Sequence, residues 1–164
     1  MSSGDFNNFE LQAMRRLLML DVSEAAELIG KVSTRSWQYW ESGRSKIPDD
    51  IEMEMYGLAQ MRNLLIDETL DDYPESDDTH LMRWYHTFDQ FIVDYPDCNK
   101  VSWRLHQAVC AFMFAESGNI SLTSDAPLLK NSYLYKWLNK QTDEQIEHAR
   151  QEEIFNKRLA KKNK

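Results

Sequence analysis

The sequence contains few of the residues that interrupt helices, since only five glycines and four prolines occur among its 164 residues. It also lacks an apolar run of about 18 residues, the usual pattern of a membrane-spanning helix. The opening MSSGDFNNFE shows neither the basic nor the apolar region of a secretory signal. We therefore expect a cytoplasmic protein without a membrane partner.

Motifs for metals, cofactors and catalysis are missing too. Cys98 and Cys110 do not have the spacing of a metal or redox motif, and both are predicted to be free thiols. His80, His86 and His106 have no second ligand at metal-site spacing. No phosphate loop, nucleotide fingerprint or Ser-His-Asp context occurs. These absences predict a protein that is not an enzyme and holds neither a cofactor nor a metal.

Negative charge dominates the composition but is concentrated in the middle of the chain. The net charge is −8, and residues 67–99 contain ten acidic residues against one basic residue. A uniformly acidic surface would repel nucleic acid. Between residues 31 and 46, however, Lys31, Arg35, Arg44 and Lys46 stand against Glu41 alone. This short segment is therefore where a basic face for a polyanion can form.

Apolar residues recur at helical spacing through most of the chain, which predicts an all-α fold. In the first half, helices are predicted over residues 7–20, 23–30, 33–43 and 48–68. Ser23 and Ser33 are the predicted N-caps of the second and third helices, and Gly43 ends the third. Two short helices joined by a tight turn and framed by longer ones are typical of a helix-turn-helix unit.

An acidic segment at residues 70–79 interrupts this pattern and predicts a boundary between domains at 1–69 and 80–164. Beyond it, helices are predicted over residues 81–92, 101–113, 125–138 and 142–164, the last with a capping-box pattern at Thr142 and Gln145. The large apolar side chains of this half can pack within the chain or form a seam between subunits. The candidate seam residues are Trp84, Phe88, Phe91, Ile92, Val109 and Phe112.

The segment VSTRSWQYWESG, residues 32–43, has two chemically different faces when it is drawn as a helix. Trp37 and Trp40 lie three residues apart on one face, and we predict that they are core, because a helix that enters a DNA groove needs an apolar back. Arginine can bind guanine O6 and N7, and glutamine can bind adenine in the same way. The candidate base-reading residues on the opposite face are Thr34, Arg35, Gln38 and Tyr39.

Polar groups around this helix are candidates for contacts to DNA phosphates. Backbone N–H groups are available at the predicted helix starts, and cations flank the third helix. The candidate phosphate contacts are Ser23, Lys31, Ser33, Arg44 and Lys46.

VSTRSWQYWESG resembles the third-helix segment of the lambda-repressor-like (XRE) superfamily, with its Val-Ser start and its Trp-Glu-x-Gly end. The longer string LQAMRRLLMLDVSEAAELIGKVSTRSWQYWESGRSKIPDDIEMEM resembles the YdiL-like family, which includes anti-CRISPR-associated autorepressors. The similarity covers residues 5–116. Lys31, between Gly30 and Val32, is an extra residue compared with many members of the superfamily. The extension at residues 117–164 has no counterpart in this resemblance, which implies nothing about its role.

The resemblance implies an N-terminal lambda-repressor-like helix-turn-helix domain with base contacts at the four positions named above. We expect a helical dimerisation domain to follow it, and a sequence-specific transcriptional regulator, a homodimeric (auto)repressor, that binds an inverted repeat in double-stranded DNA.

Two alternatives stay open, an RNA-binding module and a protein-interaction module that uses the helix-turn-helix as a scaffold. A scaffold has no use for the charges of Arg35, Arg44 and Lys46. RNA binding would use those charges without needing Gln38 at a base edge.

Overall fold

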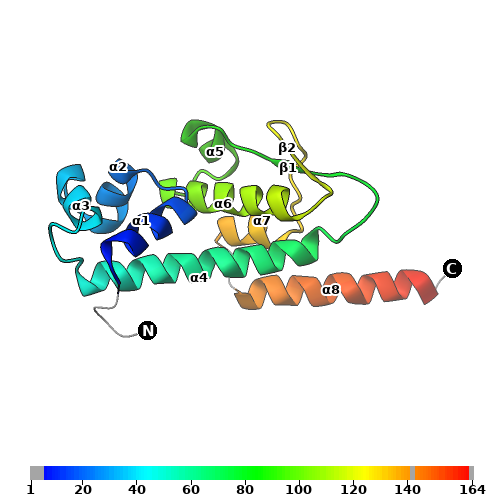
Figure 1. Cartoon of the computed structure of the whole chain (residues 1–164). Helices are drawn as coiled ribbons and strands as arrows, with labels where there is room; N and C mark the ends of the chain where they lie inside the picture. The colour runs from blue at the N-terminus through cyan, green and yellow to red at the C-terminus, as the bar shows by residue number, and fades with distance from the viewer. Residues whose placement is uncertain (1–5, 141–142, 163–164) are drawn as a thin grey trace.

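The computed structural model describes residues 6–140 and 143–162, except for the side chains of residues 143–150 and 153. The fold is mostly helical and contains one two-stranded sheet, which the all-α prediction missed (Figure 1). The elements in chain order are α1 (Asn8–Leu17), α2 (Val22–Ala25), the π-helical segment η1 (Ala26–Gly30), α3 (Thr34–Glu41), α4 (Asp49–Asp72), β1 (His80–Arg83), α5 (Phe88–Asp94), α6 (Lys100–Glu116), β2 (Ile120–Thr123), α7 (Tyr133–Leu138) and α8 (Asp143–Lys162).

α1 and η1 pack on α4, and α2 and α3 pack on η1 and on each other, at one end of the molecule (Figure 1). The four helices predicted for this half are confirmed, with shifted ends. α1 starts with a capping box, because Asn7 Oδ1 accepts from the Glu10 amide and Glu10 Oε1 accepts from the Asn7 amide, each at 2.9 Å. Leu11, Leu18 and Met55 are fully or almost fully buried between these helices. These residues belong to one hydrophobic core that continues into the second half of the chain.

α4 connects the two halves of the molecule. It contacts α1 and η1 as well as α6 and α7, and its 24 residues span roughly 36 Å. The sequence predicted an end near Glu68, but the helix continues to Asp72, because Leu65, Ile66 and Thr69 are buried against the second half. The division into domains at 1–69 and 80–164 stays a prediction, and α4 belongs to both.

The helix predicted over residues 81–92 is wrong, because β1 and α5 occupy this stretch. β1 pairs in parallel with β2, in the register His80 with Ile120 and Arg83 with Thr123. The carbonyl oxygen of Tyr85 accepts hydrogen bonds from Trp103 Nε1 at 2.9 Å and Gln107 Nε2 at 3.0 Å. The chain between β1 and α5 is therefore held to α6 by side chains rather than by helical hydrogen bonds.

The helix predicted over residues 125–138 is much shorter than expected. Only α7 forms, capped by Ser132, whose Oγ accepts from the Tyr135 amide at 3.1 Å. Asp72 at the end of α4 accepts a hydrogen bond from the Tyr133 amide at 2.7 Å, which fixes the start of α7. The helices predicted over residues 101–113 and 142–164 are confirmed as α6 and α8. The capping box predicted at Thr142 lies outside the described residues.

The six candidate seam residues do not share one surface. Phe91 and Val109 have no exposed surface and belong to the core of the chain, so their assignment to a subunit seam is wrong in this fold. Phe88 packs on Trp103, with ring centroids 6.1 Å apart. Phe112 lies nine residues after Trp103, half a turn around α6, where the Arg62 guanidinium lies 5.8 Å from its ring centroid. Trp84 and Ile92 are half-buried.

Arg104 on α6 connects α2 to the second half of the chain. Its Nε donates to Glu24 Oε1 at 2.9 Å, and its Nη2 lies 4.0 Å from Asp21 Oδ2. The guanidinium stacks on the Trp103 ring at 4.0 Å and also donates to Gln107 at 2.8 Å. Because Glu24 lies in α2, this contact fixes α2 against α6. In the part of the chain that the structure describes, no helix is long and apolar enough to cross a membrane.

Replacing Arg104 with alanine should destabilise the protein by about 1–3 kcal/mol, because the Glu24 carboxylate is almost buried and loses its cation. Urea unfolding at neutral pH measures this change. The exposed Lys130→Ala is the control and should change the free energy of unfolding by less than about 0.5 kcal/mol. Equal stability of the two variants would show that Arg104 does not couple the halves.

Candidate nucleic-acid interface

The turn before α3 contains Lys31, the residue that differs from the pattern that the sequence resembles. Lys31 adopts a left-handed conformation with φ 54° and ψ 40°, which is uncommon for a residue other than glycine. The Val32 amide then donates to the Ala26 carbonyl oxygen at 3.0 Å and closes η1. The chain therefore reverses within two residues, and the exposed Lys31 side chain lies next to the start of α3.

Gly30 allows η1 and α3 to approach closely. A Cβ atom at this position would lie 3.0 Å from Val32 Cγ2, 3.1 Å from the Trp37 ring and 3.2 Å from the Trp40 ring. These distances are shorter than ordinary van der Waals contacts. A side chain at residue 30 would therefore push α3 away from its support.

The back of α3 is anchored by its two tryptophans, which confirms that they are core. Trp37 is fully buried and Trp40 is 7 % exposed. Their ring centroids are 5.3 Å apart with an interplanar angle of 59°, a tilted arrangement that aromatic pairs favour. Because both rings lie on one face, the opposite face of α3 has a fixed direction.

A buried ion pair holds the end of α3 to α1. Arg15 donates from Nε to Glu41 Oε2 at 2.6 Å and from Nη2 to Glu41 Oε1 at 3.1 Å. The Trp37 indole N–H donates to the same Glu41 carboxylate, and Arg15 Nη1 donates to the Leu20 carbonyl oxygen at 2.9 Å. The side chains of Arg15 and Glu41 are only 9 % and 8 % exposed. This network is the main polar contact between α1 and α3.

The same partners keep Glu41 ionised. Burial opposes the charge of this carboxylate, but the hydrogen bonds from Arg15 and Trp37 outweigh it and lower the pKa of Glu41 below its usual value. Sequence reasoning missed both members of the ion pair. The only signal for Glu41 is its place in the Trp-Glu-x-Gly ending, and Arg15 has no local signal at all.

The front of α3 presents three polar side chains to solvent. Thr34, Arg35 and Gln38 are exposed, as predicted. Ser33 is confirmed as the N-cap, because its Oγ accepts from the Ser36 amide at 3.1 Å. Thr34 and Arg35 lie in the first turn of α3, so two of these three exposed side chains are at the N-terminal end of the helix.

Tyr39 differs from the other three candidate base-reading residues, because it is half-buried between two guanidinium groups. Arg44 lies 4.4 Å and Arg35 6.0 Å from its ring centroid. The Tyr39 carbonyl oxygen also accepts from the amides of Arg44 and Ser45, at 2.9 and 3.1 Å. The ring therefore positions Arg44 beside α3, a role that the sequence did not indicate.

The prediction that Ser23 caps α2 is wrong. Asp21 is the N-cap, because its Oδ1 accepts from the Glu24 amide at 2.7 Å while Glu24 Oε1 accepts from the Asp21 amide at 3.1 Å. The Ser23 hydroxyl donates to Asp21 Oδ1 at 2.8 Å. Two carboxylates thus occupy the start of α2, and they would repel a phosphate. This arrangement removes the reason for including Ser23 among the phosphate contacts.

The cations of the predicted interface are accessible. Lys31, Arg35, Arg44 and Lys46 are all exposed and lie on α3 or on the chain directly before and after it. Glu41, the one carboxylate in this segment, points into the ion pair with Arg15. The exposed charge of residues 31–46 is therefore entirely positive.

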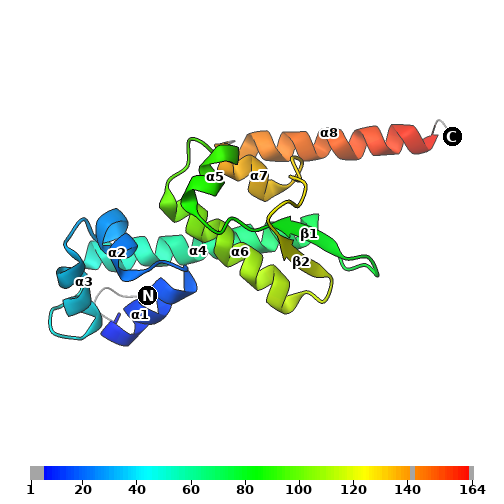
Figure 2. The same ribbon diagram turned by 90° about the horizontal axis from the view of Figure 1, so that it is seen from above.

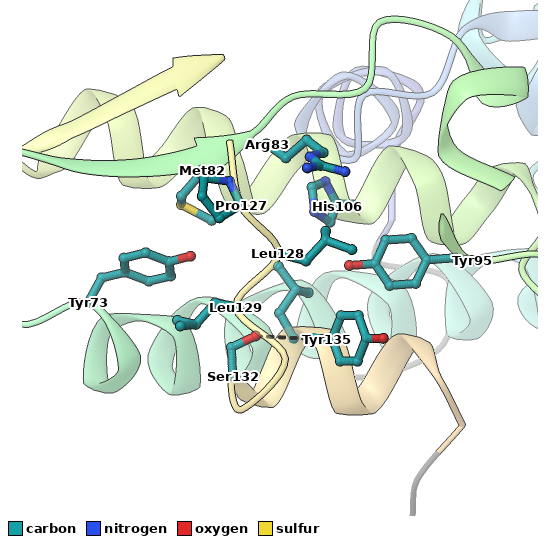
Figure 3. A pocket seen from close by; sticks show the side chains of 11 residues that line it. Tyr73, Met82, Arg83, Tyr95, His106, Pro127, Leu128, Leu129, Ser132 and Tyr135 are labelled. Carbon is teal, nitrogen blue, oxygen red and sulfur yellow. Dashed lines mark hydrogen bonds between the residues drawn. The ribbon is translucent and has the colours of Figure 1, made fainter. Parts of the chain in front are cut away.

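A second candidate site, the cavity between β1, α6 and α7, is too small for a ligand. Its volume is about 30 Å³, room for roughly one or two water molecules. Figure 3 shows Leu128 near its centre, with Tyr73 on one side and Tyr95 on the other. Burial lowers the pKa of His106 in its wall to about 4, so this imidazole is neutral. Within residues 6–140 and 143–162, no cluster of potential ligands is arranged to hold a metal ion.

A family model described as Aca2/YdiL-like matches residues 6–122, from the start of α1 to β2. The chain belongs to the Aca2/YdiL-like family. It is similar to the Aca2 repressor of Pectobacterium phage ZF40, with 51 % identity over 109 residues, which cover 66 % of this chain and 93 % of that protein. It is also similar to the uncharacterised protein YdiL of Escherichia coli K12, with 28 % identity over 110 residues, again 66 % of this chain and 93 % of that protein.

The Aca2/YdiL-like match confirms the family resemblance read from the sequence and includes all residues of the candidate interface around α3. It also includes Arg15 and Arg104, which fix α3 and α2. It excludes α7 and α8, so the chain carries about forty residues beyond the matched region.

Replacing Glu41 with glutamine should lower the free energy of unfolding by about 3–5 kcal/mol, because the buried Arg15 guanidinium loses its counter-charge. Chemical denaturation at neutral pH measures the loss. Glu27→Gln, an exposed change in the same helical unit, is the control and should change stability by less than about 0.5 kcal/mol. Two similar curves would mean that the ion pair does not hold α3.

Acidification provides a separate test of Glu41. Its pKa is lowered in the folded protein, so its stabilising effect is complete above the usual value of 4.5 and is lost as the pH falls through the lower folded value. The stability difference between the wild-type protein and Glu41→Gln should therefore be constant near neutrality and shrink below about pH 4.5. A difference that stays constant down to pH 3, or grows, contradicts this assignment.

Proposed function

We propose that this protein is a transcriptional repressor that inserts α3 into the major groove of duplex DNA. One observation carries the proposal. The three exposed polar residues of α3 lie on the side opposite to Trp37 and Trp40, which are completely or almost completely buried. A fixed helix with such a surface is what helix-turn-helix proteins place in the groove, with its N-terminal residues at the bases. The name of the related Aca2 repressor supports the regulatory role.

Arg35 is assigned to a base and Gln38 to a neighbouring position. Arg35 lies in the first turn of α3 and is exposed, so its guanidinium can reach O6 and N7 of a guanine. Gln38 lies about one turn further along the same face and can bind adenine N6 and N7. Thr34 is assigned to a hydroxyl or methyl contact at the helix start. Tyr39 is assigned mainly to positioning the Arg44 guanidinium, and only secondarily to a base contact.

The remaining cations are assigned to the phosphates that flank the groove. Lys31 precedes α3, Arg44 and Lys46 follow it, and all three are exposed. Ser33 adds the N-terminal end of α3, where a helix dipole favours negative charge. Phosphate contacts of this kind position the protein without reading the sequence.

Repression by a helix-turn-helix protein requires more surface than one such unit supplies. A single unit buries too little surface for tight specific binding, and a two-fold dimer binds two half-sites of an inverted repeat. We assign the dimer contact to the second half of the chain, where Trp84, Phe88 and Ile92 are half-buried and Val93 of α5 is 79 % exposed. The operator upstream of the protein's own gene is the first DNA to test.

Arg35→Ala should weaken binding to the operator by about 1–3 kcal/mol and binding to random DNA much less, because only the operator presents the correct base. Lys46→Ala should weaken both equally, because phosphates are present in every sequence. Fluorescence anisotropy with labelled duplexes measures these affinities. An Arg35 variant that loses the same affinity on both DNAs would make Arg35 a phosphate contact.

Two further measurements, the salt dependence of the affinity and the binding of an RNA, separate DNA binding from the two alternatives. If about six phosphates are contacted, the logarithm of the affinity should fall with the logarithm of the salt concentration with a slope near −5. A hairpin RNA that binds as tightly as the operator, with Gln38→Ala unchanged on both, would favour the RNA-binding alternative. Affinity that does not change with salt would favour the scaffold alternative.

The dimer makes a prediction about spacing. Two half-sites centred about 10–11 bp apart lie on the same face of the duplex, and an insertion of about 5 bp moves one to the opposite face. Tight binding should be lost with this insertion, because a dimer whose units are rigidly joined cannot reach a half-site on the opposite face. Equal affinity for the two spacings would mean that the two units are not rigidly joined.

A further inference from the structure

The two-stranded sheet ends in a strand that is paired on one side only. β2 pairs with β1, and no third strand follows it within residues 6–140 and 143–162. In both views the two strands lie in the second half of the molecule, away from α3 (Figures 1 and 2). The edge of such a strand presents a row of backbone donors and acceptors to which another strand can be added. The outer edge of β2 is therefore a candidate binding surface.

The hydrogen bonds to β1 identify the backbone groups on this outer edge. The carbonyl oxygens of Asn119 and Thr123 accept from β1 and its flanking amide at 2.7 and 2.8 Å. Successive residues of a strand direct their backbone groups to opposite edges. The N–H and C=O groups of Ile120 and Leu122 therefore point away from β1. Within the described residues, no hydrogen bond occupies these four groups.

The side of β1 that faces away from β2 is already occupied. There the Arg83 carbonyl oxygen accepts from Cys110 Sγ at 3.7 Å. Just beyond the strand, the Tyr85 carbonyl oxygen accepts from Trp103 and Gln107. All three donors belong to α6. Of the two strands, β2 is therefore the one with an edge to offer.

The segment around β2 lacks the residues that normally protect an open edge. Natural edge strands carry charges or prolines that prevent pairing with another chain. Residues 117–124, SGNISLTS, contain neither a charged residue nor a proline, although 28 % of the chain is charged. An antiparallel copy of the same segment brings no like charges together. The sequence of β2 therefore permits pairing with itself.

We infer that β2 pairs with β2 of a second copy of the chain in antiparallel orientation, so that the two sheets form one sheet of four strands. This inference rests on the dimer of the proposed function and names its contact. With Ser121 on the two-fold axis, Ile120 of each copy lies opposite Leu122 of the other, and their outward N–H groups meet the outward carbonyl oxygens. The contact is the same on both copies, so it joins two chains and stops.

The surface beside the β2 edge continues into the contact already assigned to the dimer. Ser124, the residue after β2, lines an open hollow of about 380 Å³ together with Trp84 and Val93. Val93 is 79 % exposed. Hydrogen bonds between two short strands do not hold a dimer alone, because a stable interface buries more than about 1,000 Å². A second copy can cover both the edge and these apolar side chains, whereas an added peptide strand covers the edge alone.

Sedimentation velocity on the full chain without DNA tests the inference. Ser121→Lys should weaken association roughly ten-fold or more, because two like charges then lie directly opposite each other at the axis. Ser121→Asp should do the same, and an equimolar mixture of the two variants should associate again. Leu81→Lys is the control and should leave association unchanged. Leu81 is exposed and pairs with Ser121 on β1, one strand further from the axis.

A disulfide cross-link tests the register of the two strands. Residues directly opposite at a position without hydrogen bonds have Cα atoms about 4.5 Å apart, a distance that a disulfide can span. Ser121→Cys should therefore form a covalent dimer under mild oxidation. Thr123→Cys is the matched control and should not, because it lies opposite Asn119 of the second copy. Cys98 and Cys110 are buried and stay out of the reaction.

Failure of this inference is distinguishable from failure of the proposed function. Arg35→Ala should associate like the wild-type chain, even where it loses the operator. The inference is overturned if the wild-type chain is monomeric, if Ser121→Lys associates like the wild type, if the mixture of charged variants does not associate, or if Ser121→Cys cross-links no better than Thr123→Cys. A Ser121→Lys variant that still dimerises and binds the operator would leave the proposed function intact and place the dimer contact elsewhere.

Discussion

The carboxylate of Glu41 determines where α3 points. It accepts two hydrogen bonds from Arg15 of α1 and one from the Trp37 indole, so the end of α3 is joined to α1 while Trp37 and Trp40 fill the space behind it. A buried ion pair need not add stability compared with an apolar pair, but it accepts only one geometry. The direction of Arg35 and Gln38 relative to the rest of the fold follows from this geometry.

If two copies are to read two half-sites, α3 must also have a fixed orientation relative to the second half of the chain. α4 provides a continuous helix from the α3 unit to α6 and α7, and the Arg104–Glu24 ion pair fixes α2 to α6 on another side. Through these two connections, the helices around α3 are packed against the second half of the chain. Because α4 continues to Asp72, the connection after it begins later in the acidic segment at 70–79 than the sequence predicted.

The sequence predicted the α3 unit well because its signals are local. Apolar spacing, the Ser33 cap and the tryptophan pair all lie within a few residues of the structure they specify. The wrong prediction for Ser23 also concerned local signals. Asp21 and Glu24 form a reciprocal capping box, so Asp21 and not Ser23 is the N-cap of α2.

The second half was predicted less well because its structure depends on distant residues. β1 forms because residues 80–83 pair with residues 120–123, and periodicity within either segment does not contain that information. For Phe91 and Val109, the apolar spacing in the sequence is the same whether the side chains face the core or a partner. Arg104 meets Glu24 across 80 residues, so no motif connects them.

The central claim is that Arg35 reads a guanine, and a double-mutant cycle with modified operators tests it directly. Each guanine of a half-site is replaced in turn with 7-deazaguanine, which lacks the N7 acceptor, and the affinities of the wild-type protein and Arg35→Ala are measured. The account predicts one position per half-site where the modification weakens the wild-type protein about three- to ten-fold and leaves Arg35→Ala unaffected. If every modified guanine weakens both proteins equally, Arg35 does not read a base at N7, and the assignment of α3 as the reading helix loses its main support.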